Sequence, residues 1–114
     1  MPYLKIQTNL PFLNQAERSL LKSASALVAS ELGKPESFVM VALQPGTPML
    51  FAGSDDPTAF LQLAAIGLPE SQTKKLSAAL CALVQEHLGI DRARIFVTFV
   101  DVHPGMWGWA GDVF

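Results

Sequence analysis

The chain has 114 residues, of which 50% are hydrophobic and 16% are charged, and its net charge is −2. This length fits one domain, so we expect residues 1–114 to fold as a single unit. The slight negative charge argues against nucleic acid as a partner, and without a run of about 20 apolar residues or a secretory leader we expect a cytoplasmic protein that does not insert into membranes.

The first half of the chain predicts a strand, a helix and a second strand. Apolar and polar residues alternate over residues 3–8, which is typical of a strand with one buried face. Apolar residues then recur at helical spacing over residues 15–32, with Asn14 as the predicted N-cap and Gly33 directly after the last turn. An apolar strand is predicted at residues 37–43.

The second half predicts the same order of elements. Residues 59–65 form an apolar strand, residues 71–88 a helix that ends at Gly89, and residues 94–100 the last strand.

The two halves therefore appear as pseudo-repeats of about 2–56 and 58–112, because a shift of 56 residues places Gly33 on Gly89. Two β-α-β units with the usual crossover would build a four-stranded mixed sheet with both helices on one face. The predicted fold class is α+β.

The second face of such a sheet would be uncovered. Apolar strand residues argue against its exposure to solvent, namely Val39, Val41, Leu61, Leu63, Ile95 and Val97. A short, apolar chain also has little interior in which to bury its hydrophobic residues. We expect a homo-oligomer in which three sheets close around a common core.

Pro2 follows Met1, and removal of Met1 would give it a free secondary amine. An amine can act as a base, whereas a peptide nitrogen cannot, and α-amino groups in peptides titrate near pH ~8. Burial or a nearby cation would lower that pKa toward neutrality, where a general base is most effective. Many proteins begin with Met-Pro for no catalytic reason, so this start needs support from the rest of the chain.

Several short segments occur in an order that is typical of one protein family. They are Pro2 before a strand ending in Thr8-Asn9, Gly33-Lys34-Pro35, Phe51-Ala52-Gly53-Ser54 before Pro57, Ile66-Gly67, Ser71, Leu80-Cys81, Asp101, Gly108-Trp109 and Phe114. On these segments the whole chain resembles macrophage migration inhibitory factor and D-dopachrome tautomerase, in the tautomerase superfamily. The resemblance implies a homotrimer with active sites between subunits. It also implies cofactor-free keto-enol tautomerisation of α-keto acids such as phenylpyruvate, and of dopachrome-type compounds.

The resemblance assigns roles to three residues of one subunit. Pro2 would be the general base, Lys34 would bind the substrate carboxylate, and the backbone amide of Ile66 would contact the ligand. From the residues alone, Lys34 could equally be a solvated lysine at a helix C-terminus, and Ile66 could belong to the core.

Phe96 and Thr98 match positions that the family supplies from the neighbouring subunit. Vertebrate members carry tyrosine and asparagine there, so this chain loses one hydroxyl and one amide. The substrate range is therefore open, and packing within the trimer is an alternative role for both residues.

Trp107, Trp109 and Phe114 give the C-terminal segment an aromatic character that suits a pocket for an aromatic ring. Alternatively, this segment caps the sheet of a neighbouring subunit. Trp107 replaces a smaller aliphatic residue of vertebrate members, which would narrow the pocket.

No metal or redox site is expected. Cys81 is the only cysteine, and the Cys-x-x-Cys motif of vertebrate members is replaced by residues 57–60, so we expect no dithiol activity. His87 and His103 fit no metal-ligand spacing.

A second hypothesis is a cytokine-like effector that binds a receptor protein and retains only a weak or vestigial tautomerase pocket. The departures at Phe96, Thr98 and Trp107 favour it. The missing signal peptide does not exclude export, because vertebrate members leave cells without one.

Overall fold

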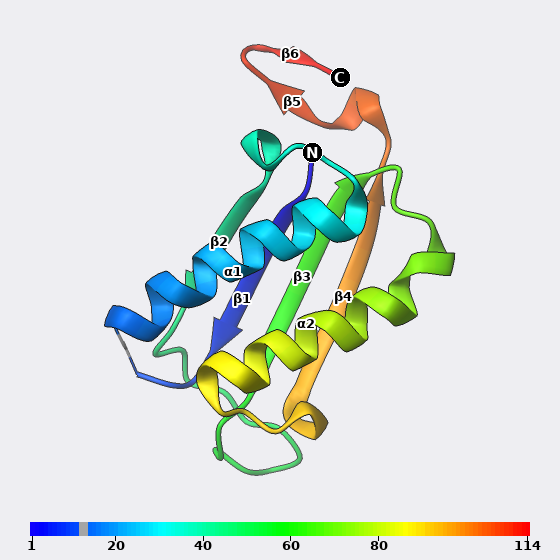
Figure 1. Ribbon diagram of the computed structural model, residues 1–114. Coiled ribbons are helices and arrows are strands. Elements are labelled where there is room, and N and C mark those ends of the chain that lie inside the picture. The colour runs from blue at the N-terminus through cyan, green and yellow to red at the C-terminus, as the bar shows by residue number, and fades with distance from the viewer. Residues whose placement is uncertain (12–13) are drawn as a thin grey trace.

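The computed structural model describes residues 1–11 and 14–114. Its main body is a four-stranded sheet with two α-helices packed on one side (Figure 1). In chain order the elements are β1 (Tyr3–Thr8), α1 (Asn14–Leu32), β2 (Met40–Gln44), β3 (Ala59–Ile66), α2 (Thr73–Leu88), β4 (Ile95–Val102), β5 (Gly108–Trp109) and β6 (Asp112–Val113). In the described part of the chain, neither helix is long and apolar enough to cross a membrane.

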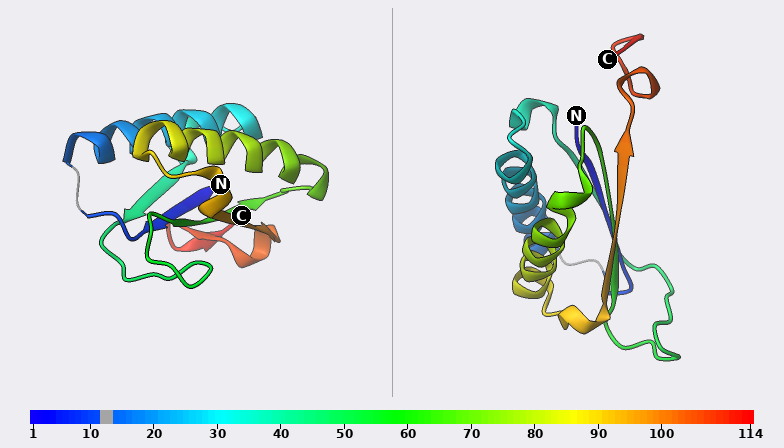
Figure 2. Two further views of the ribbon diagram at one scale, coloured as in Figure 1. Left: turned by 90° about the horizontal axis from the view of Figure 1, so that it is seen from below. Right: turned by 90° about the vertical axis from the view of Figure 1, so that its right-hand side faces the viewer.

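The sheet has the strand order β2-β1-β3-β4. β1 pairs in parallel with β2 and antiparallel with β3, and β3 pairs in parallel with β4. Each parallel pair is joined through one helix, and the right-hand view of Figure 2 shows both helices on the same side of the sheet. The predicted pair of β-α-β units in a mixed sheet is confirmed.

The core lies between the helices and the sheet. Alternate strand residues such as Leu4 and Leu63 are fully buried, because side chains of a strand point to its two faces in turn. The helices contribute residues at helical spacing, which are Leu20, Ala24 and Val28 from α1 and Leu76, Leu80 and Val84 from α2. Full burial of one such leucine contributes about 1.5–3 kcal/mol.

Both helices end at the predicted glycines. Gly33 has φ 61°, and the next backbone N–H, of Lys34, donates to the Ala29 carbonyl at 3.0 Å. Gly89 has φ 68°, and its N–H donates to the Gln85 carbonyl at 2.9 Å. These bonds satisfy carbonyls of the last turn, and the left-handed conformation favours glycine.

Several predicted boundaries shift, among them the starts of three elements. Asn14 is itself the first helical residue and not the cap, and the position before it lies outside the described residues. The strand predicted from residue 37 begins at Met40, because Glu36–Phe38 forms a 3₁₀ turn. The helix predicted from residue 71 begins at Thr73, after a similar turn over Glu70–Gln72.

The face of the sheet away from the helices differs from the prediction. The six residues expected to need cover there pack on the helix side instead: Val39, Val41, Leu61, Leu63, Ile95 and Val97. Their alternating neighbours form the open face, with a polar row of Lys5, Gln62 and Thr98 in its middle. The prediction chose the wrong side of each strand. The exposed apolar side chains on this face are fewer, and include Met40 at 65%, Phe96 at 60% and Val100 at 52%.

Candidate active site

A cavity of about 510 Å³ opens at the N-terminal end of β1. Three segments that are distant in sequence line it: Met1–Tyr3, the residues Ser37–Met40 with Ala42, and the C-terminal residues Trp107–Trp109 with Phe114. In Figure 1 the hairpin of β5 and β6 stands directly beyond the N-terminus. Most of the side chains that line the cavity are hydrophobic or aromatic, and few are polar.

Three aromatic rings form one wall of this cavity. The Phe38 ring meets Trp109 edge-on at 5.4 Å between centroids and Phe114 at 6.2 Å. Trp109 and Phe114 stack at 5.7 Å with an interplanar angle of 15°. These edge and stacked geometries are the favourable ones for aromatic pairs.

The hairpin that carries two of these rings depends on its turn. Ala110 and Gly111 both have positive φ, 53° and 84°, as in the tight turns that join two antiparallel strands. The Phe114 N–H donates to the Trp107 carbonyl at 3.2 Å. The turn and this bond direct the chain end back over the cavity.

Pro2 is fully buried at the base of the cavity. Its carbonyl accepts a hydrogen bond from the Met40 N–H at 3.0 Å, so the pairing of β1 with β2 fixes its position. The nitrogen of Pro2 is bonded to Met1 in this structure, and the free amine is that of Met1. Burial, and secondarily the Lys34 cation, lowers the pKa of the Met1 α-amino group below its ordinary value of 8.0. The environment at this end of the chain therefore favours the neutral form of the Met1 amine.

Lys34 acts on this region through its charge, although it is not among the residues that line the cavity. The glycine turn at the end of α1 brings it toward the chain's N-terminus. The Lys34 ammonium group therefore adds positive charge close to the chain's N-terminus.

The other three predicted site residues do not line this cavity within one chain. Ile66 ends β3 and faces the open side of the sheet, and Thr98 lies near the middle of that side. Along the strands, Phe96 lies two residues beyond the row of the cavity-lining Ala42. It is also on β4, three strands across the sheet from Ala42 on β2, which at about 4.8 Å per strand is roughly 14 Å.

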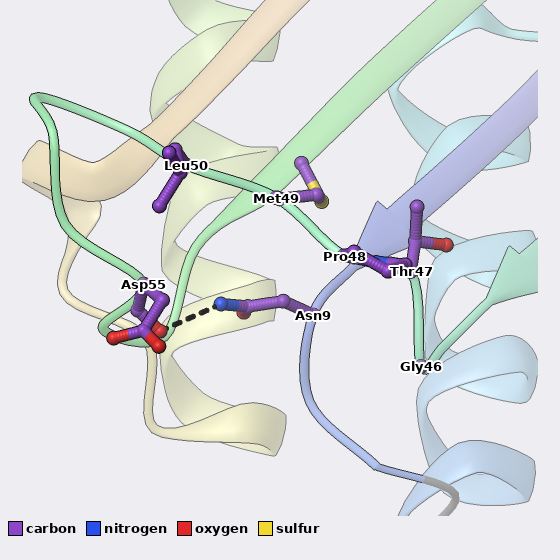
Figure 3. A pocket seen from close by; sticks show the side chains of 7 residues that line it. All are labelled: Asn9, Gly46, Thr47, Pro48, Met49, Leu50 and Asp55. Carbon is purple, nitrogen blue, oxygen red and sulfur yellow. Dashed lines mark hydrogen bonds between the residues drawn. The ribbon is translucent and has the colours of Figure 1, made fainter.

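A second cavity, of about 540 Å³, lies at the opposite end of the sheet (Figure 3). The Asn9 side chain spans it, donating to the carbonyls of Asp55 at 2.9 Å and Asp56 at 3.1 Å and accepting from the Thr58 N–H at 2.9 Å. Asn9 thus serves to hold the loop that precedes β3. None of the predicted site residues lines this cavity, so we take the aromatic cavity as the candidate active site.

Several lining residues were missed from sequence, above all Phe38, Met40 and Ala42. The parallel pairing of β2 with β1 brings them beside Pro2, and a strand register is needed to foresee it. In the sequence, these residues could be linked to the site only by their position just before or within a strand that would pair with β1.

The remaining reactive side chains have structural explanations. Cys81 is a free, half-buried thiol on α2, and the Nδ1 atom of His103 accepts from the Gly105 N–H at 3.2 Å within a 3₁₀ turn. Across residues 1–11 and 14–114, no three His, Cys, Asp or Glu side chains converge in a way that could hold a metal ion.

The α+β fold of two β-α-β units, with a cavity at the amino end of β1, is that of the tautomerase superfamily. The chain belongs to the macrophage migration inhibitory factor family, whose family model, "Macrophage migration inhibitory factor (MIF)", matches residues 1–114. It is 37% identical to a macrophage migration inhibitory factor homolog of Brugia malayi, over all of this chain and 99% of that protein. The crystal structure of a homologue from Prochlorococcus marinus superposes with a TM-score of 0.94 at 40% identity, covering 98% of both chains. The Toxoplasma gondii macrophage migration inhibitory factor gives 0.92 at 38% identity, covering 98% of this chain and 99% of that one.

Proposed function

We propose that this protein is a cofactor-free keto-enol tautomerase of phenylpyruvate-like α-keto acids and dopachrome-type compounds. Its general base is the amine of Pro2, set free when Met1 is removed. The observation that carries the proposal is the place of Pro2, buried at the base of an aromatic cavity. In these surroundings burial and the Lys34 cation lower the pKa of the chain's free amine.

The reaction needs one proton to move in two steps. The neutral Pro2 nitrogen takes a proton from the carbon next to the ketone, and the electron pair of that C–H bond forms the enol double bond as the carbonyl oxygen becomes negative. The protonated amine then returns the proton to that oxygen, so no atom is gained or lost. A low amine pKa keeps the base neutral at working pH, and the Lys34 ammonium group holds the substrate carboxylate.

The aromatic wall accounts for the substrate class. Rings such as those of Phe38, Trp109 and Phe114 can contact a substrate ring by stacking and edge contacts. An α-keto acid with an aromatic side chain would then place its ring against this wall and its carboxylate toward Lys34.

We further propose that three copies of this single-domain chain assemble and that the neighbouring copy completes each site. Phe96 is 60% exposed and lies on β4, across the sheet from its own chain's cavity, with Thr98 on the same face. A trimer would cover these side chains and bring them to the cavity of the next subunit. This arrangement is supported by family membership and by the exposed apolar residues of the open face.

The ultraviolet absorbance change of phenylpyruvate enolisation tests the proposal. Purified Met1-free protein, verified by intact mass, is compared with Pro2→Gly at matched concentration. We expect activity in the first and a loss of at least about 100-fold in the second, the usual contribution of a positioned general base. A fully active Pro2→Gly protein would refute the role of Pro2. An inactive Met1-free protein would refute the enzyme and favour a receptor-binding effector.

A further inference from the structure

Arg94, in the turn before β4, holds one loop through four hydrogen bonds. Its guanidinium donates to four backbone carbonyls: Pro57 at 3.0 Å, Phe51 at 3.1 Å, Ser54 at 3.1 Å and Asp56 at 3.0 Å. All four acceptors belong to the loop of residues 51–57. Because guanidinium is a planar fork with five donors, a lysine could not make this set of bonds.

The same loop is tied to the sheet at other points. The Asn9 side chain holds it from the β1 end, as Figure 3 shows, and the Phe51 and Ser54 backbones bond each other at 3.0 Å. The buried Thr58 hydroxyl donates to the Arg94 carbonyl at 2.7 Å, which fixes the backbone of Arg94 in turn. The loop is therefore a platform held by hydrogen bonds at several points.

This platform carries a ring that touches Phe96. The Arg94 guanidinium lies 5.2 Å from the centroid of the Phe51 ring, which favours a cation–π contact. The Phe51 ring meets the Phe96 ring at 4.7 Å between centroids, with a tilt of 54°. A contact chain thus runs from Arg94 through Phe51 to Phe96.

A largely exposed phenylalanine on a strand has more than one accessible rotamer, and a packed neighbouring ring restricts that choice. Phe96 lies too far across the sheet to serve its own chain's cavity. Its ring orientation therefore has a consequence only for a site that another subunit completes.

We propose that Arg94 and Phe51 are positioning residues that fix the ring of Phe96 for the active site of the neighbouring subunit, where it favours aromatic over aliphatic α-keto acids. The inference rests on the proposed function, because Phe96 reaches substrate only across a subunit interface. Neither Arg94 nor Phe51 touches substrate.

The first test uses Phe51→Leu, which keeps an apolar side chain and the backbone carbonyl that Arg94 binds. Deuterium exchange at the carbon next to the ketone is followed by NMR for phenylpyruvate and for the aliphatic 2-oxopentanoate. We expect KM for phenylpyruvate to rise about fivefold, the effect of one aromatic pair. The KM for 2-oxopentanoate, kcat and the pH profile stay unchanged. For Phe51→Tyr, which retains the ring, we expect the wild-type KM for phenylpyruvate.

The second test compares two arginines. Arg94→Lys keeps the charge but cannot make the four hydrogen bonds to the loop carbonyls. It is therefore expected to raise KM for phenylpyruvate in the same way. Arg92→Lys is the matched control, because Arg92 is exposed and its Nε donates to the Gln85 side chain at 3.2 Å, so KM is expected to stay at the wild-type value.

Sedimentation verifies that each variant assembles as the wild type does. If the wild type is active but KM for phenylpyruvate is unchanged in Phe51→Leu and Arg94→Lys, this inference is overturned while the proposed function stands. Loss of assembly in Phe51→Leu would also overturn it, because the ring pair would then hold subunits together. Inactive Met1-free wild type would instead refute the proposed function, and this inference with it.

Discussion

Replacing Lys34 by methionine is expected to weaken substrate binding. The end of α1 sets the place of Lys34, since its N–H bonds the Ala29 carbonyl at 3.0 Å and Gly33 has φ 61°. A hydrogen bond to a charged group contributes about 1.5–3 kcal/mol, which corresponds to roughly 10- to 150-fold in affinity. Lys34 is partly exposed, so solvent screening favours the lower end, and we expect KM for phenylpyruvate to rise about tenfold.

The same variant is expected to shift the pH dependence. Burial first, and then the Lys34 cation, lowers the pKa of the amine at the chain start, and we expect both causes to act on Pro2 once Met1 is absent. The base works when neutral, so activity falls as pH drops through this pKa. Without Lys34 only burial remains, the pKa rises, and the acid limb of kcat/KM moves to higher pH.

Initial rates of enolisation across pH measure both effects. Lys22→Met, an exposed lysine on α1, is the matched control and should keep the wild-type KM and acid limb. The reasoning would be refuted by a Lys34→Met protein that shows wild-type values of both.

Three further predictions concern stability and the aromatic wall. The buried Thr8 hydroxyl donates to the Thr58 carbonyl at 2.8 Å and accepts from the Leu10 N–H at 3.2 Å. Thr8→Val should therefore lower the free energy of unfolding by about 2–3 kcal/mol, and Tm by about 10 °C at fixed protein concentration; an unchanged Tm would contradict this. Gly89 has φ 68°, and no atom lies within 4 Å of a Cβ added there. Gly89→Ala should therefore lower the free energy of unfolding only by the backbone strain, about 1 kcal/mol, as measured by denaturant titration. A stabilised variant would argue against strain at this position. Phe38→Leu should raise KM for phenylpyruvate about fivefold and leave the acid limb of kcat/KM in place, whereas an unchanged KM would remove this ring from substrate binding.

The sheet and its helices could be predicted from sequence because their periodicities are clear. The strand predicted at residues 3–8 matches β1, in which Leu4 and Ile6 are buried and Lys5 is not. Glycines at both helix ends gave the C-terminal boundaries. The 3₁₀ turns after Pro35 and Pro69 were not foreseen, because a single turn carries no periodic signal.

The open face could not be assigned from sequence. Strand residues of both parities include apolar side chains, such as Leu61 on one face of β3 and Phe60 on the other. Which parity faces the helices depends on how the helices dock, and this is a tertiary property. The prediction that Leu61 and Val97 required cover from other subunits therefore failed.

The candidate site was predictable only in part. Pro2 and the aromatic C-terminal residues stood out by their type and were found to share one cavity. The β5–β6 hairpin was missed, because its turn is Ala110-Gly111 and not one of the Asn-Gly or Asp-Gly pairs that mark such turns. The place of Phe38 follows from the 3₁₀ turn before β2 and from the register of β2 against β1, neither of which the sequence displays.

The central claim is that the free amine of Pro2 is the base, and the most direct measurement compares one sequence in two forms. Protein that retains Met1 and protein that has lost it are separated, identified by intact mass and assayed for phenylpyruvate enolisation. The two forms differ by one residue that converts the Pro2 amine into an amide. We predict activity in the Met1-free form alone, whereas equal activity in both forms would contradict the claim.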